Sequence, residues 1–224
     1  MLGPLLLDMI MTSIDKGSFS RDVNIALISL LIKKDKDCSS YRPLSLLNTD
    51  LTIFAKVLAR RMQSHIPTFV SCDQTGFIKS RLAADNVRRL LHIVYAAVDK
   101  TVPAAVLSFD AMKAFDRLEW SFLWAVLGKM DFGEYFIHMI KDLYSNRSAL
   151  VLTGQLSSAL FPVTRSSRQG CPLSPAIFAL FLEPLAQMIR QSPTVHPISI
   201  RDTHHHLSLY ADDDVYGEAT TIYT

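Results

Sequence analysis

The sequence predicts an α+β protein in which antiparallel strands are backed by amphipathic helices. Leucine, tyrosine and valine flank a run of aspartates in residues 207–216, which is typical of a β-hairpin with acids at its turn. Residues 104–109 form an apolar run long enough for one buried strand. Residues 51–65 and 85–98 carry apolar side chains at helical spacing. Short strands and amphipathic helices are therefore both expected.

Composition places the chain among globular proteins of one large domain or two small subdomains. Of its 224 residues, 49% are hydrophobic and 20% are charged. The formal net charge of +2 divides into +5 over residues 1–100 and −3 over residues 101–224. A basic first half would suit phosphate binding and an acidic second half would suit metal binding. Ordinary surface variation gives the same asymmetry.

Cysteine usage and hydropathy limit the cellular setting. Cys38, Cys72 and Cys171 are few, odd in number and widely spaced, so they predict neither a disulfide framework nor a zinc site. They favour a reducing intracellular compartment, cytoplasm or nucleus. No apolar run approaches the roughly 20 residues of a membrane span, so no membrane partner is expected.

The elements before residue 100 follow from periodicity and capping signals. We expect a helix over 4–16, a strand over 24–32, a charged turn over 33–37, a helix over 51–65 capped by Thr49 or Asp50, and a helix over 85–98 capped by Asp85. The predicted core stripe of the last helix is Val87, Leu90, Leu91, Val94 and Ala97. The charged turn is either a solvated tip or a flap whose lysines meet a triphosphate.

Strands and helices are also expected after residue 100. We expect a strand that ends at Asp110, a helix from Phe115 to Met130, a helix over 134–145, a hairpin of 149–153 and 160–164 joined through Gly154, and a helix over 176–188 with a kink at Pro184. Pro162 lacks an N–H, so the second hairpin arm is expected at a sheet edge.

The carboxylates are the strongest chemical signal. Asp212 and Asp213 repel each other unless a cation lies between them, and a hard divalent ion such as Mg²⁺ takes oxygen ligands. A solvated hairpin tip is the simpler alternative. Asp110 changes this balance, because an Asp at the end of a buried strand reaches the sheet edge. If Asp110 and Asp212 lie on adjacent strands, they can share two cations about 3.5–4 Å apart, the arrangement for in-line phosphoryl transfer.

Two further stretches suit nucleotide contact. Arg42 precedes Pro43, which favours an extended backbone and a fixed guanidinium suited to bidentate phosphate contact. The alternative is a structural arginine paired with an aspartate. Gln169 offers a donor and an acceptor, or caps a helix, and Gly170 permits close backbone approach.

Three motifs in this order resemble those of reverse transcriptases. The first is Phe109-Asp110 with Ala114-Phe115-Asp116, the second is Arg168 to Pro175, and the third is Tyr210-Ala211-Asp212-Asp213. Upstream, the stretches from Tyr41 to Asn48 and from Asp73 to Ile78 are similar to fingers motifs of non-LTR, LINE-type retrotransposons. The set spans nearly the whole chain in the family's order.

This resemblance implies a right-hand polymerase palm over residues 101–224 and a helical and β-hairpin fingers region over residues 1–100, together one reverse transcriptase domain. It implies RNA-directed DNA synthesis from dNTPs on an RNA template and a DNA primer. The implied catalytic and metal-binding residues are Asp110, Asp212 and Asp213, with two Mg²⁺, or Mn²⁺ in their place. The implied nucleotide-binding residues are Arg42 at the triphosphate, Phe115 at the sugar, and Gln169 and Gly170 in the pocket. A core phenylalanine is the alternative reading of Phe115.

The sequence departs from the family pattern at Met112, where an acid is usual, near Ser166, where glycine is expected, and at Asp214, which replaces an apolar residue. Since the sequence stops at Thr224, we expect the thumb and the upstream endonuclease to be missing and primer–template to be held weakly. Two alternatives stay open. One is a catalytically inactive retroelement remnant that binds nucleic acid weakly. The other is an RNA-dependent RNA polymerase, which would have a small residue in place of Phe115.

Overall fold

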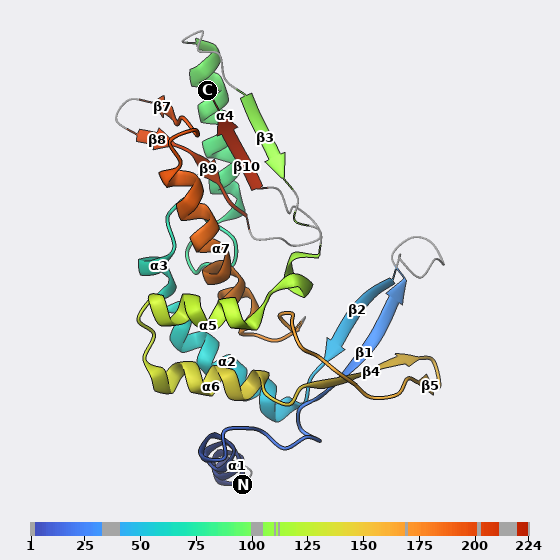
Figure 1. Cartoon of the computed structure of the whole chain (residues 1–224). Helices are drawn as coiled ribbons and strands as arrows, with labels where there is room; N and C mark the ends of the chain where they lie inside the picture. Colours follow the sequence, from blue (N-terminus) through green and yellow to red (C-terminus); the bar gives the residue numbers. More distant parts are fainter. Residues whose placement is uncertain are drawn as a thin grey trace. The chain divides into compact units, whose positions relative to one another are not determined.

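The computed structural model of the chain (Figure 1) describes residues 3–32, 41–99, 105–109, 111, 113–168, 170–200, 203–210 and 219–223. The chain forms two compact units, each built from segments that are distant in sequence. Unit 1 comprises Met1–Arg61 and Phe115–Ser174, and unit 2 comprises Met62–Ala114 and Pro175–Thr224. The division into fingers-like and palm regions at residue 100 stays a prediction.

Helices and short strands are mixed along the chain, in agreement with the predicted α+β class. The helices are α1 (Gly3–Asp15), α2 (Thr49–Gln63), α3 (Ile66–Phe69), α4 (Ala83–Asp99), the 3₁₀ helix η2 (Ala114–Arg117), α5 (Trp120–Lys129), α6 (Glu134–Tyr144) and α7 (Ser174–Gln191). The strands are β1 (Ile25–Ile32), β2 (Tyr41–Leu46), β3 (Ala105–Phe109), β4 (Ser148–Thr153), β5 (Leu156–Ser157), β6 (Phe161–Pro162), β7 (Ile198–Ile200), β8 (Thr203–His205), β9 (Leu207–Ser208) and β10 (Ala219–Tyr223).

Unit 1 contains a mixed sheet of order β2-β1-β4-β5, with β6 also paired to β4. Strands β1 and β2 are antiparallel, from Leu27 opposite Leu46 to Ile32 opposite Tyr41, which confirms the predicted strand over 24–32. Strand β4 runs parallel to β1. In the described part of the sheet, β6 pairs with β4 alone, so Pro162 lies at an edge as its missing N–H requires.

Unit 2 contains a three-stranded sheet of order β3-β10-β9 and the pair β7-β8. Strand β10 is antiparallel to both β3 and β9. Strand β9 lies where the first arm of the hairpin was predicted, whereas β10, which pairs with β9, begins beyond the predicted stretch of residues 207–216. The residues that connect them, 211–218, lie outside the described residues.

The prediction of one helix from Phe115 to Met130 is wrong at its start. Residues 114–117 form the 3₁₀ turn η2, and α5 begins only at Trp120. The intervening carbonyl of Leu118 accepts a hydrogen bond from the Ser166 N–H at 2.9 Å instead of one from the next helical turn. A long-range contact therefore interrupts a locally favourable helix.

The capping residue of α2 also differs from the expectation. The side-chain Oδ1 of Asn48 accepts the Asp50 N–H at 2.9 Å, so Asn48 caps the helix rather than Thr49 or Asp50. The predicted span of the helix is otherwise close to the observed Thr49–Gln63.

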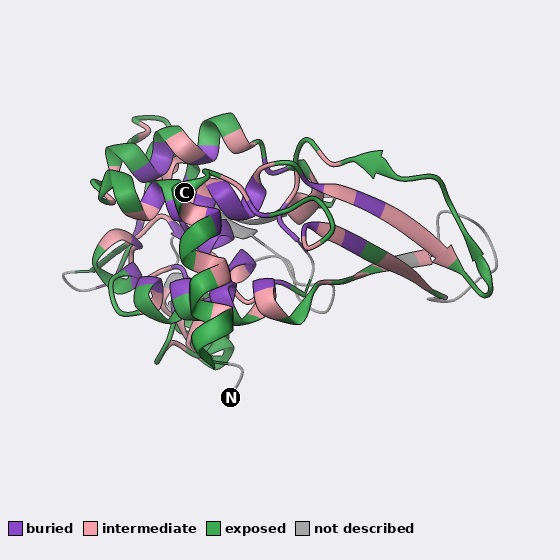
Figure 2. Cartoon of the chain, turned by 90° about the horizontal axis from the view of Figure 1, so that it is seen from below, coloured by how far each residue is buried: buried purple, intermediate pink, exposed green. Residues whose placement is uncertain are grey.

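The predicted core stripe on α4 is wrong at several positions. Val87, Leu91 and Val94 are 59%, 50% and 39% exposed, whereas Ile93 is 1% exposed. Figure 2 shows that buried, intermediate and exposed positions alternate along the helices. Ile93 packs with Ile198 and Ile200 of β7, and Leu90 is packed against that cluster. Both faces of α4 carry apolar side chains, so helical periodicity alone did not indicate which face β7 would cover.

A buried ion network joins α7 to residue 73 within unit 2. Arg190 donates through Nε and Nη2 to the two carboxylate oxygens of Asp73 at 2.8 and 2.5 Å. Its Nη1 donates to Glu183 Oε1 at 2.8 Å, and Glu183 is 3% exposed. Arg190 is therefore the shared cation of two nearly buried carboxylates.

Replacing Arg190 by methionine is expected to lower the free energy of unfolding by about 3 kcal/mol, because Asp73 and Glu183 would be left buried without their cation. Methionine and arginine have similar helix propensities, so local helix stability changes little. Urea unfolding followed by circular dichroism measures the difference.

The matched control is Arg88→Met on α4. Arg88 pairs with Asp85 at 3.5 Å, but the two side chains are 77% and 41% exposed. Such a surface pair contributes at most about 1 kcal/mol. If Arg190→Met and Arg88→Met destabilise the protein equally, the buried network does not stabilise unit 2.

Candidate functional site

In the three-stranded sheet of unit 2, the strands that lead into the first and third predicted motifs finish at the same end of the sheet. Strands β3 and β9 both run antiparallel to β10, so they run parallel to each other. Ser108 and Ser208 both face Thr220 in the register. The chain therefore leaves β3 after Phe109 and β9 after Ser208 on the same side of the sheet.

Asp110 follows Phe109 directly in the sequence, and Asp212 and Asp213 follow Ser208 after three residues. All three aspartates lie outside the described residues, so their role as a metal-binding trio stays a prediction. The structure does change the expectation that Asp110 and Asp212 follow adjacent strands. Strands β3 and β9 are not adjacent, because β10 lies between them.

Leu209, the residue after β9, is hydrogen-bonded to three residues. Its N–H donates to the Asp73 carbonyl at 2.9 Å, and its carbonyl accepts the Thr75 N–H at 3.0 Å. The side-chain amide of Asn86 donates to the same carbonyl at 2.6 Å. The segment around Gln74, which is fully buried, thus forms a parallel bridge with Leu209 and positions the chain entering the third motif.

Within unit 1, the segment after the first motif is bonded to the segment that opens the second. The Ser167 N–H donates to the Phe115 carbonyl at 2.8 Å. The indole N–H of Trp120 donates to the Ser166 carbonyl at 2.9 Å. Phe115 is half-buried on η2, and its backbone is therefore fixed to the chain that leads to Gly170.

Two backbone positions near the second motif have positive φ. Gly170 has φ +85°, and a Cβ added to it would lie 3.0 Å from the Ser45 carbonyl oxygen of β2. Ser166 has φ 94°, in the region that favours glycine, which gives a physical reason for the glycine expected near this position. Gln169 lies outside the described residues. Arg42 lies on β2 opposite Leu31, but its side chain is outside the description.

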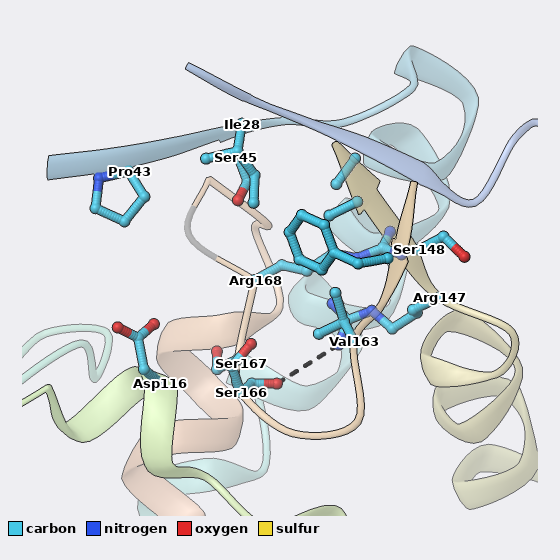
Figure 3. A pocket seen from close by; sticks show the side chains of 13 residues that line it. Ile28, Pro43, Ser45, Asp116, Arg147, Ser148, Val163, Ser166, Ser167 and Arg168 are labelled. Carbon is cyan, nitrogen blue, oxygen red and sulfur yellow. Dashed lines mark hydrogen bonds between the residues drawn. The ribbon is translucent and has the colours of Figure 1, made fainter. Parts of the chain in front are cut away.

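A cavity of about 190 Å³ lies beside this segment in unit 1 (Figure 3). Its walls come from strands of the mixed sheet and from the chain that leads to Arg168. The lining residues are Ala26, Ile28, Pro43, Ser45, Asp116, Arg147, Ser148, Ala149, Phe161, Val163, Ser166, Ser167 and Arg168.

Two buried arginines give this cavity its electrostatic character. Arg168 is 8% exposed, and its Nη2 donates to the carbonyl and the Oδ1 of Asn24 at 3.2 and 2.6 Å. Arg147 is 4% exposed, and its guanidinium carbon lies 4.2 Å from the Tyr144 ring centroid and 5.3 Å from that of Trp120. None of these contacts supplies the full negative charge that would neutralise either arginine.

Burial opposes the charged form of both arginines. Desolvation lowers the pKa of Arg147, with a partial opposing effect from Tyr144. Desolvation, and then repulsion from Arg147, lowers the pKa of Arg168 to about 9. Arginine side chains stay protonated in proteins, so the cavity carries two neighbouring positive charges.

Sequence reasoning missed Arg147 and the role of the Arg168 side chain. Arg147 lies between α6 and β4, where no motif marks it, and its burial results from tertiary contacts with Tyr144 and Trp120. The lone arginine beside an aromatic residue at a helix end is too common a pattern to indicate a site. Residues 73–75 were related to a fingers motif, but their hydrogen bonds to Leu209 were not foreseen.

Neither a cluster of metal-ligating side chains nor a membrane-spanning helix is present among the described residues. No group of three or more His, Cys, Asp or Glu side chains gathers there in a way that could hold a metal ion. None of the described helices is long and apolar enough to cross a membrane.

Comparison with known families gives one broad match. The family profile described as "Reverse transcriptase (RNA-dependent DNA polymerase)" matches residues 32–219. This range includes strands β3 and β9, both arginines of the cavity and all three motifs singled out above, and it ends at the first residue of β10.

Individual proteins of mobile elements are similar over most of the chain. The transposon TX1 uncharacterized 149 kDa protein of Xenopus laevis is 32% identical over 95% of this chain, which is 16% of that protein. The RNA-directed DNA polymerase from mobile element jockey of Drosophila melanogaster is 26% identical over 89% of this chain and 22% of its own length. The Pol polyprotein from type-1 retrotransposable element R2 of Popillia japonica is 25% identical over 76% of this chain and 24% of its own length. The chain thus spans less than a quarter of each of these relatives.

Replacing Ser166 by glycine is expected to raise the free energy of unfolding by about 1 kcal/mol, because it removes strain at φ 94°. The control is Ser20→Gly, at an exposed position whose φ is not positive, where greater freedom of the unfolded chain should destabilise slightly. Thermal and urea unfolding measure both. Equal effects of the two substitutions would show that Ser166 is not strained.

Replacing Gly170 by alanine is expected to destabilise the protein by about 2 kcal/mol, because positive φ strain and the 3.0 Å approach to Ser45 act together. Gly17→Ala is the matched control, since Gly17 has φ +69° with nothing within 4 Å of an added Cβ. It tests backbone strain without the clash and should cost about 1 kcal/mol. If both variants lose the same stability, the packing of Gly170 on β2 has no energetic effect.

Proposed function

Because the chain belongs to the reverse transcriptase (RNA-dependent DNA polymerase) family, we propose that it synthesises DNA on an RNA template by two-metal nucleotidyl transfer, within a protein of a non-LTR retrotransposon. The observation that carries this proposal is the sheet order β3-β10-β9. In this order, the chain leaves β3 after Phe109 and β9 after Ser208 at the same end of the sheet. Asp110 and the pair Asp212 and Asp213, about 100 residues apart in the sequence, follow these two strands.

Asp110, Asp212 and Asp213 are the proposed metal ligands. Carboxylate oxygens are the donors that Mg²⁺ prefers, and Mn²⁺ accepts the same set. Strands β3 and β9 are next-but-one neighbours, so about 10 Å separates their backbones, a gap that two ions about 4 Å apart and their carboxylates can span. When bound, the ions would activate the primer 3′-hydroxyl and stabilise the leaving pyrophosphate. The aspartates themselves would hold the ions in place.

Arg42, Phe115, Gln169 and Gly170 are the proposed nucleotide-binding residues. Arg42 would contact the triphosphate through its planar guanidinium. Phe115 would screen the sugar, Gln169 would face the base pair or sugar, and Gly170 would allow the backbone to approach. Support comes from the contacts within unit 1. The strand that carries Arg42 packs on Gly170, and the Phe115 backbone is bonded to Ser167.

The proposed partners are an RNA template, a DNA primer and dNTPs. The printed names of two relatives, an RNA-directed DNA polymerase and a retrotransposon Pol polyprotein, support this choice. The described residues that line the cavity of unit 1 also supply positive charge close to the second motif.

Primer extension tests the proposal directly. The full 224-residue chain is incubated with an RNA template, a labelled DNA primer, dNTPs and Mg²⁺. We expect extension that EDTA abolishes and that Asp110→Asn and Asp212→Asn each lower by more than about 100-fold, which corresponds to about 2.7 kcal/mol of transition-state stabilisation.

Asp131→Asn is the matched control, because Asp131 is exposed and its φ of 56° suits asparagine. It should leave extension unchanged. Salt-sensitive RNA binding without extension by the wild-type chain would contradict the proposal and support the inactive remnant. Equal incorporation of ribonucleotides would contradict the role of Phe115.

A further inference from the structure

Arg147 and Arg168 are buried cations with no carboxylate partner in the described part of the chain. Arg168 contacts Asn24, and Arg147 contacts the Ser166 carbonyl at 3.5 Å and two aromatic rings. Dipoles and ring faces offset part of a charge, but they do not replace a counter-ion. Two neighbouring positive charges of this kind make the cavity attractive to an anion.

Two residues of the cavity lining carry donors without a partner among the described residues. Arg147 Nε and Ser167 Oγ are buried without a hydrogen-bond partner among the described residues, although Arg147 is 4% and Ser167 1% exposed. A buried donor without an acceptor is unfavourable, so each such group needs an explanation. Both residues belong to the lining of the 190 Å³ cavity, and Figure 3 labels both among the side chains that line it.

Size and shape agree with a phosphate group. The cavity exceeds the roughly 150 Å³ of an engineered apolar cavity that binds benzene. A phosphate has several acceptor oxygens, and the planar fork of arginine matches its geometry. Asp116 also lines the cavity, but Figure 3 shows it well separated from the Arg147 guanidinium. The positive side of the cavity is therefore distinct from its carboxylate.

We propose that this cavity is a phosphate-binding site in which Arg147 and Arg168 supply the charge and Ser167 supplies a hydroxyl donor. The ligand is a phosphate group, carried by a polynucleotide backbone or by a free phosphate or nucleotide. The site extends the proposed function without depending on it, because the two-metal reaction does not require it and a phosphate can bind whether or not DNA is made.

Trp120 provides a local signal for the test. Trp120 and Trp124 are the two tryptophans of the chain, and Trp120 lies against Arg147 and bonds to Ser166. The full chain is titrated with inorganic phosphate at constant ionic strength, in EDTA, while tryptophan fluorescence and the thermal midpoint are followed. We expect a saturable fluorescence change and a midpoint that rises with phosphate concentration.

Arg147→Met should weaken phosphate binding at least tenfold, because it keeps an apolar contact with the rings but removes the charge. Ser167→Ala, which removes one hydroxyl group, should weaken it about threefold and covers the case in which Arg147→Met fails to fold. The control is Arg165→Met, since Arg165 is 63% exposed and pairs with Glu119 at 3.7 Å. It should bind phosphate like the wild type.

Two further titrations identify the source of the phosphate. A single-stranded RNA oligonucleotide that displaces inorganic phosphate would indicate a backbone phosphate, and displacement by a dNTP alone would indicate a nucleotide. The absence of saturable phosphate binding, or unchanged binding by both Arg147→Met and Ser167→Ala, would overturn the site. Because the titrations contain no divalent metal, loss of primer extension leaves their result unaffected.

Discussion

The hydrogen bonds between Arg168 and Asn24 are the contact on which unit 1 depends. Arg168 Nη2 donates to both the carbonyl and the side-chain oxygen of Asn24, which is fully buried. The side-chain amide of Asn24 donates in turn to the Ser145 carbonyl. One buried asparagine thus joins the start of β1, the end of α6 and the chain that leads into Gly170. Water cannot replace these bonds at a buried position, so the sheet and the second motif are held together.

Buried arginines are paired with carboxylates in unit 2 but not among the described residues of unit 1. This difference indicates a structural role in unit 2 and a binding role in unit 1. In unit 2, Arg190 is matched by Asp73 and Glu183, so its charge is compensated within the fold. In unit 1, Arg147 and Arg168 meet carbonyls and ring faces among the described residues, and their pKa values are lowered chiefly by desolvation. A compensated network stabilises a fold, whereas an uncompensated one favours an external anion.

Elements with local signals were predicted well, and elements decided by distant contacts were not. The strand over 24–32 follows from its isoleucine and leucine content, and it is present as β1. Strand β9 is present where the first arm of the aspartate hairpin was predicted, and the predicted turn lies outside the described residues. The start of α5 was mispredicted because the Leu118 carbonyl bonds to Ser166, a residue 48 positions away. The exposed face of α4 was mistaken for its core face because both faces are apolar.

The residues of the candidate site also divide into those that a local sequence pattern marks and those that only tertiary contacts mark. The motifs that contain Phe115 and Gly170 could be recognised from the sequence because the residues themselves form the pattern. Arg147 could not, since its significance arises only when Tyr144, Trp120 and Ser167 surround it. Family resemblance therefore indicates where chemistry is expected, and tertiary structure indicates which nearby charges lack a partner.

Ser166 departs from the family pattern at a position whose backbone favours glycine. Its φ of 94° is unfavourable for serine, yet its N–H bonds to Leu118 and its carbonyl accepts from Trp120. Strained residues persist where surrounding contacts determine the conformation more strongly than the local preference does. The serine is therefore held by its contacts at an unfavourable φ in the segment that leads to Gly170. The distinction between polymerase and remnant rests on the aspartates.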